Sequence, residues 1–191
     1  MKLKDLQFQE YLSLGYLYLI IVGILGDVIY YKFFNITILN YTSITDVMLS
    51  PINILFTRLK TLIAFVVVLS LAYVIFKYIV PRYQSEEVKE KNAKMLEEHG
   101  AAPQYFILAL FVFSMFMGFG LGRGQKLSNQ IAENNVVPTH EIHFSNDQIE
   151  RVKVIGQNSM FIFYAKEGET EVMIAPLQEN IRQIKILPEE D

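Results

Sequence analysis

Apolar residues in this chain come in three long blocks, each long enough to cross a lipid bilayer as a helix. In the block Ala101–Gly122 no residue carries a charge. As a helix it would be about 33 Å long, which matches the apolar part of a bilayer. Tyr11–Tyr31 would span about 30 Å in the same way. The second block along the chain begins after a capping Ser50 and runs from Pro51 to Val80, before Pro81. The pattern therefore predicts three transmembrane helices.

The segments between the apolar blocks differ in character. Residues 32–50 are too polar for a span and too apolar for a free linker, so an interfacial segment, a re-entrant segment and a fourth membrane segment remain alternatives. Residues 82–100 are highly charged, and the pairs Glu87–Lys91 and Glu90–Lys94 have the spacing that stabilises a helix. This part predicts a solvated connecting helix. The aromatic residues that follow the first block suit the headgroup boundary: Tyr30, Tyr31, Phe33 and Phe34.

After residue 137 the pattern changes to short runs rich in Val, Ile and Phe, which are typical of β-strands. Five strands are predicted, at Glu141–Ser145, Ile149–Ile155, Met160–Lys166, Glu171–Ala175 and Ile181–Leu187. They predict a small antiparallel β roll or barrel. The expected organisation is a membrane helical domain at 1–124, a polar stalk at 125–137 and a soluble β domain at 138–191.

Charge and cysteine content exclude several classes of function. Between residues 136 and 191 there are ten acidic side chains and five Lys or Arg, which argues against nucleic-acid binding. The chain has no Cys, so disulfides, zinc–thiolate sites and cysteine nucleophiles are excluded.

Asp27 is the ionisable residue inside the first predicted span. A carboxylate at such a depth is a functional-site candidate and usually has a partner. In a three-span arrangement the bases Arg58, Lys60 and Arg123 lie on the same side of the membrane as Asp27. We predict that Asp27 pairs with one of these bases. The alternative is a carboxylate that lies near the headgroups, where it is solvated or paired with a nearby base.

The third block ends in four alternating glycines: Gly118, Gly120, Gly122 and Gly124. They form two frames of small residues four apart, Gly118/Gly122 and Gly120/Gly124, and such frames allow helices to approach closely. Glycines also weaken a helix, so a flexible exit from the membrane is the alternative.

The sequence contains no recognisable catalytic or cofactor motif. His140-Glu-Ile-His143 has one residue between Glu and the second His, where the helical zinc-protease motif has two. In a strand, positions 140 and 143 point to opposite faces, so we expect no metal site there. The glycines near residue 120 match neither of the phosphate-binding motifs G-x-x-x-x-G-K-[ST] and G-x-G-x-x-G. We therefore expect a protein that is not an enzyme and binds no cofactor.

Three spans place the two termini on opposite sides of the membrane. Seven Lys or Arg residues flank the spans on the side of the N-terminus and five on the other side. The positive-inside rule then puts the N-terminus in the cytoplasm and the C-terminal β domain outside it. A re-entrant segment or fourth crossing around residues 38–56 would instead place the β domain inside. The expected location is a bacterial inner (plasma) membrane.

Two functions are compatible with this organisation. The first is an oligomeric, membrane-anchored sensor or adaptor that is embedded in the lipid bilayer, associates with copies of itself and binds a partner or ligand through the β domain. The second is a channel-like or pore-like effector in an oligomer. Few polar residues in the spans disfavour the second.

Overall fold

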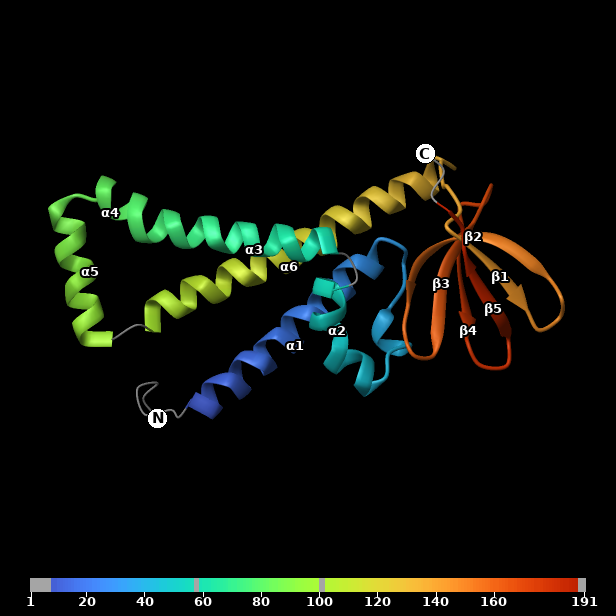
Figure 1. Ribbon diagram of the computed structural model, residues 1–191, viewed down its shortest axis with the longest axis horizontal. Helices are drawn as coiled ribbons and strands as arrows, with labels where there is room; N and C mark the ends of the chain where they lie inside the picture. The colour runs from blue at the N-terminus through green and yellow to red at the C-terminus, as the bar shows by residue number, and fades with distance from the viewer. Residues whose placement is uncertain (1–7, 57–58, 100–101, 189–191) are drawn as a thin grey trace. The chain divides into compact units, whose positions relative to one another are not determined.

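The computed structural model describes residues 8–56, 59–99 and 102–188 (Figure 1). The helical elements are α1 (Phe8–Lys32), the 3₁₀ turn η2 (Ile38–Asn40), α2 (Ile44–Phe56), α3 (Leu59–Val74), the π-helical segment η3 (Ile75–Ile79), α4 (Val80–Tyr83), α5 (Glu86–His99) and α6 (Ala102–Ala132). The chain forms two compact units: the first is Met1–Gly23 with Ser50–Phe116, and the second is Ile24–Leu49 with Met117–Asp191.

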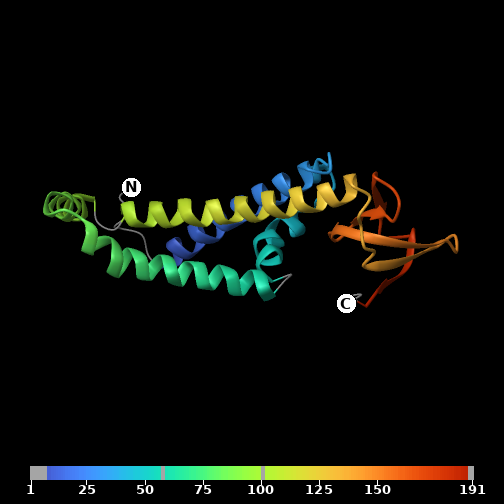
Figure 2. The ribbon, with the colours of Figure 1, turned by 90° about the horizontal axis from the view of Figure 1, so that it is seen from above.

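Three helical stretches in the described part are long and apolar enough to cross a membrane. They are Gln9–Lys32, Val66–Tyr83 and Gln104–Ala132. This agrees with the prediction of three spans by length and composition. Figure 2 shows that α6 is one continuous helix, so its four glycines do not interrupt it.

The predicted limits of the second helix are wrong. Helix α2 begins at Ile44 and contains Pro51 inside it. The chain also remains helical past the predicted stop, because Pro81 lies in the first turn of α4, directly after the π-helical segment η3. Proline has no backbone N–H to donate, and in a regular α-helix its ring clashes with the carbonyl four residues earlier. The wider π-helical segment lies directly before the turn that contains Pro81, where this clash would occur.

The first unit contains a close approach of α1 and α2 at this proline. A Cβ added to Gly23 would lie 2.9 Å from the backbone nitrogen of Pro51. The hydroxyl of Tyr18 also donates a hydrogen bond to the carbonyl of Ala109, which joins α1 to α6 within the same unit. The connecting helix α5 is charged as predicted, and Glu90 and Lys94 form an ion pair at 2.8 Å.

The second unit contains an antiparallel sheet of five strands: β1 (His140–Phe144), β2 (Ile149–Gln157), β3 (Phe161–Lys166), β4 (Val172–Pro176) and β5 (Ile181–Ile186). Their order is β4-β3-β2-β1-β5, so β5 returns beside β1 after a four-stranded meander (Figure 1). The five predicted strands and their antiparallel pairing are confirmed. The predicted domain limits at residues 124 and 137 remain a prediction.

Both faces of the sheet are packed. The first face bears Ile155, Phe163 and Ala165, which share a core with residues outside the sheet. The second face forms a core of its own from Ile142, Phe144, Val152, Ile162, Tyr164 and Ala175. A small sheet buries its own face in this way only by curving around it. In the described residues, this curved sheet has β4 and β5 as unpaired edges, so it is not a closed barrel.

Candidate functional site at the helix–sheet junction

Helices α1 and α6 approach closely within the second unit. A Cβ added to Gly120 would lie 2.8 Å from the carbonyl oxygen of Gly26, and a Cβ on Gly124 would overlap the ring of Phe33. A Cβ on Gly118 or Gly122 would meet no atom of the described structure within 4 Å. The Gly120/Gly124 frame therefore lies in the contact between the two helices, and the Gly118/Gly122 frame does not.

Two of the predicted ionisable residues lie beside this contact. The guanidinium carbon of Arg123 is 5.1 Å from the ring centroid of Tyr30, a cation–π distance. Asp27 lies one helical turn before Tyr31 in α1, within the same unit as Arg123. Arg58 lies outside the described residues, and the side chain of Lys60 is not described. The predicted pairing of Asp27 remains a prediction.

The hydroxyl of Tyr30 connects the end of α1 to strand β2. The register between β2 and β3 passes from Val154 to Gly156, so Ile155 is the extra residue of a β-bulge and has no partner on β3. Tyr30 donates a buried hydrogen bond of 2.8 Å to the carbonyl oxygen of Ile155. The helix thus satisfies a carbonyl at the point where the ladder is interrupted.

Tyr31 makes the second contact with the same strand. A Cβ on Gly156 would overlap the Tyr31 hydroxyl, so only a glycine leaves room for that side chain. The Tyr31 ring also packs edge-on against Phe163, with ring centroids 5.0 Å apart. Tyr30, Tyr31 and Phe34 are each only 8% exposed. Their side chains are buried in a core that they share with the sheet. Their position at the headgroup boundary stays a prediction.

A polar cluster fixes the other side of the junction. Ser43 and Asp46 form a reciprocal cap at the start of α2, in which Asp46 N–H donates to the Ser43 hydroxyl and Ser43 N–H donates to the Asp46 carboxylate, both at 3.1 Å. The same carboxylate accepts hydrogen bonds from the Ser159 N–H at 3.1 Å and from its hydroxyl at 2.8 Å. Asp46 therefore attaches the β2–β3 turn to the start of α2.

The pKa of Asp46 reflects these contacts. Burial raises the pKa, but the hydrogen bonds from Ser43 and Ser159 outweigh burial, and the net result is a pKa below the ordinary value. Nearby, the Asn158 side chain donates to the Tyr41 carbonyl at 2.9 Å, so the turn has a second attachment. Sequence reasoning missed this cluster, although Ser43-Ile-Thr-Asp46 has the spacing of a capping box.

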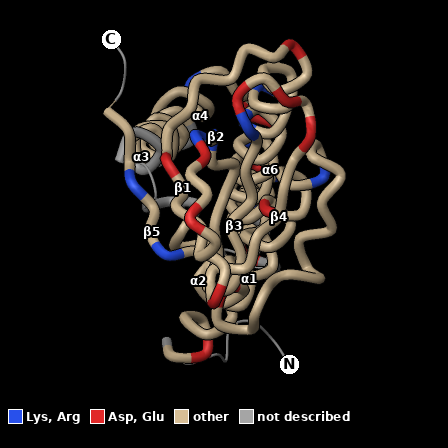
Figure 3. The backbone as a smooth tube through the Cα atoms, turned by 90° about the vertical axis from the view of Figure 1, so that its right-hand side faces the viewer, with Lys and Arg blue, Asp and Glu red and all other residues tan. Residues whose placement is uncertain are grey.

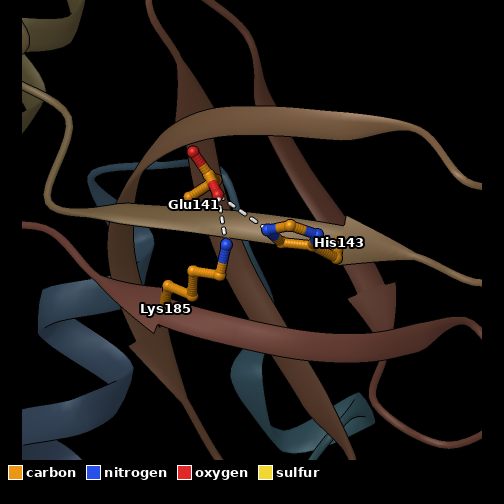
Figure 4. Close-up of polar contacts among 3 residues, drawn as sticks. All are labelled: Glu141, His143 and Lys185. Carbon is orange, nitrogen blue, oxygen red and sulfur yellow. Dashed lines mark hydrogen bonds and ion pairs between the residues drawn. The ribbon is translucent and has the colours of Figure 1, made fainter.

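A further polar cluster lies on the sheet. The Glu141 carboxylate is 2.7 Å from Nε2 of His143 and 3.2 Å from Nζ of Lys185 (Figure 4). These two hydrogen bonds hold the pKa of Glu141 below its usual range. His140 lies on the opposite face of β1 from His143, and its Nδ1 is 2.9 Å from the Thr139 hydroxyl. Among the described residues, no group of three or more His, Cys, Asp or Glu is placed to hold a metal ion.

Comparison with known proteins gives no relative for this chain. No protein-family model, curated protein or solved structure matches it. The junction must therefore be interpreted from its own contacts. It can transmit a displacement between strand β2 and helix α1, because their residues share one buried core.

Proposed function

We propose that the chain is a non-enzymatic integral membrane protein that works as an oligomeric sensor or adaptor. Its sheet binds a partner or ligand, and the helices respond. The observation that carries this proposal is the buried hydrogen bond from Tyr30 to the Ile155 carbonyl, because it joins a candidate membrane helix to the sheet. A sheet on a flexible tether would have no means of moving the helix.

The physical basis of the response is close packing. Ile155, Phe163 and Ala165 of the sheet are buried in one core with Tyr30 and Tyr31 of α1 and with Ile131 of α6. Packed cores deform little, so a shift of β2 or β3 displaces the helix ends as well. The Asp46 cluster adds a second connection, from the β2–β3 turn to α2. A partner that moves or stiffens the sheet would bias the helices through both connections.

The proposal is tested by loosening each face of the sheet separately in the full chain, reconstituted in lipid nanodiscs. Phe163 and Ile162 are neighbours, both fully buried, and they point into different cores. Phe163→Leu should speed amide hydrogen exchange at residues 24–34 as well as in the sheet. Ile162→Val, the matched control, should affect the sheet and leave residues 24–34 unchanged. Equal exchange at residues 24–34 in both variants would contradict the proposed coupling between the first face of the sheet and the end of α1.

Oligomer formation and conduction are measured on the same samples. The proposal expects light scattering to give a mass above that of one chain, and expects liposomes containing the protein to retain an entrapped dye. A monomer in lipid and in detergent would contradict an oligomeric adaptor. Dye release that depends on the protein would favour the channel-like alternative.

A further inference from the structure

Basic residues of the sheet gather on one face. Lys153 is paired with Ala165 in the register of β2 and β3, so it shares the first face with that core residue. Arg151 lies two residues earlier on the same face and is paired with Glu141, which is paired in turn with Lys185. We define Arg151, Lys153 and Lys185 as the basic face. Figure 3 marks Lys and Arg in blue and Asp and Glu in red along the backbone of these strands.

The basic face is rich in positive charge, whereas the rest of the chain after position 136 is acidic. Three of the five Lys and Arg residues after position 136 lie on it, and Glu141 is the one acidic residue in the same stretch of the register. Glu141 is already bonded to His143 and Lys185. The remaining nine acidic residues lie at other positions, several of them in turns at Glu167, Glu169 and Glu179. Within the paired strands, the basic face thus carries three basic side chains and one acidic side chain, although the region as a whole is acidic.

The position of the basic face follows from its continuity with the junction. Elsewhere on the first face, Ile155 and Phe163 contact Tyr30 and Tyr31, which belong to the candidate span Gln9–Lys32. Lys153 is two residues from Ile155 along β2, or about 7 Å, and β5 lies two strands from β2, or about 10 Å. These distances are comparable to the Debye length of about 8–10 Å in physiological salt.

We infer that the basic face binds the headgroups of anionic lipids at the surface of the membrane that the helices cross. This inference rests on the membrane placement proposed above. Anionic headgroups attract Lys and Arg near the surface, and each such residue favours contact by about fivefold. The end of a lipid-spanning helix is necessarily surrounded by headgroups, so lipid reaches this face more readily than the acidic turns of a second copy.

The test uses the absence of native Cys. A single fluorophore is attached to Cys introduced at Gln183, which is exposed and paired with His143, or at Gln178 in the β4–β5 turn as a reference. The full chain is reconstituted in nanodiscs of phosphatidylcholine, with or without phosphatidylglycerol, and a spin label on the headgroups quenches nearby fluorophores. We expect stronger quenching at Gln183 in the anionic discs, reversed by high salt, and little change at Gln178.

Two exposed arginines provide matched variants. Arg151→Gln removes a charge from the basic face and should lower the headgroup-contact equilibrium by about fivefold. Arg182→Gln removes a charge from β5 that is paired with Asp147 and should leave the equilibrium unchanged. Both side chains are exposed, so neither change should alter the thermal unfolding of the protein.

The outcomes separate this inference from the proposed function. Quenching that is the same in both lipid mixtures, or equally affected by the two substitutions, would overturn the lipid contact. So would concentration-dependent crosslinks between the basic face and the acidic turns of another copy. Alkaline washing tests the membrane placement independently. A chain released by alkali would defeat both proposals, whereas a retained chain with lipid-insensitive quenching would defeat only the lipid contact.

Discussion

Replacement of Gly120 by Ala should destabilise the protein by forcing α1 and α6 apart. The added Cβ would lie 2.8 Å from the Gly26 carbonyl oxygen, and ordinary contact begins near 3.4 Å. The helices would have to separate by about 0.6 Å, because the obstructing atoms are all backbone atoms of Gly26, which cannot rotate away. Overpacking of this kind costs about 1–3 kcal/mol.

Gly122→Ala is the matched control for this change. The position lies two residues along the same helix, but a Cβ there meets nothing within 4 Å in the described structure. Alanine favours a helix interior over glycine by about 1 kcal/mol, and this gain applies to both variants. The difference in unfolding free energy between Gly120→Ala and Gly122→Ala therefore isolates the packing cost of about 1–3 kcal/mol.

Thermal unfolding in detergent measures this difference, under conditions where light scattering shows a single chain. For a chain of this size 1 kcal/mol corresponds to about 2–4 °C, so Gly120→Ala should melt several degrees below Gly122→Ala. Equal melting temperatures, or a lower value for Gly122→Ala, would refute the assignment of Gly120 to the helix contact.

Three other predictions concern the junction and the topology. Tyr30→Phe should destabilise the protein by about 1–3 kcal/mol in chemical denaturation, because the buried Ile155 carbonyl loses its donor; an unchanged midpoint would contradict this. The folded-state pKa of Asp46 is lowered, so its contribution to stability is present above its ordinary pKa of 3.8 and is lost as the pH falls through the lower folded value. Acid unfolding below about pH 4 should therefore be less steep in Asp46→Asn than in the parent protein. Single Cys at Asn40, Asn92 and Asn146 should label from opposite sides of the membrane, with positions 40 and 146 together; labelling of all three from one side would exclude three spans.

The sequence predicted local structure well because its signals are local. A short run rich in Ile and Phe located β3 as Met160–Lys166, and the structure has Phe161–Lys166. The start of α2 was missed because Ser50-Pro51 resembles a helix start, whereas the cap is formed by Ser43 and Asp46. Both segments match known sequence patterns for the start of a helix, and only the backbone geometry shows which of them starts α2.

The junction was not predictable, because its contacts join distant parts of the chain. Tyr30 and Ile155 are separated by 125 positions, and no local pattern pairs them. The two glycine frames could not be distinguished either. Successive residues turn by about 100° in a helix, so Gly118 and Gly120 point to different sides, and the sequence does not say which side meets α1. Arg123 was identified as a candidate, but its contact with the ring of Tyr30 was not.

The direct packing of the sheet on the end of α1 is tested most sharply by a double-mutant cycle between Tyr31 and Gly156. A methyl group at position 156 would overlap the Tyr31 hydroxyl, and Tyr31→Phe removes that hydroxyl. Gly156→Ala alone should therefore lower the unfolding free energy, and the same change made in Tyr31→Phe should lower it much less. The expected coupling energy is about 0.5–3 kcal/mol. Strictly additive effects of the two substitutions would show that the helix and the sheet are not in contact there.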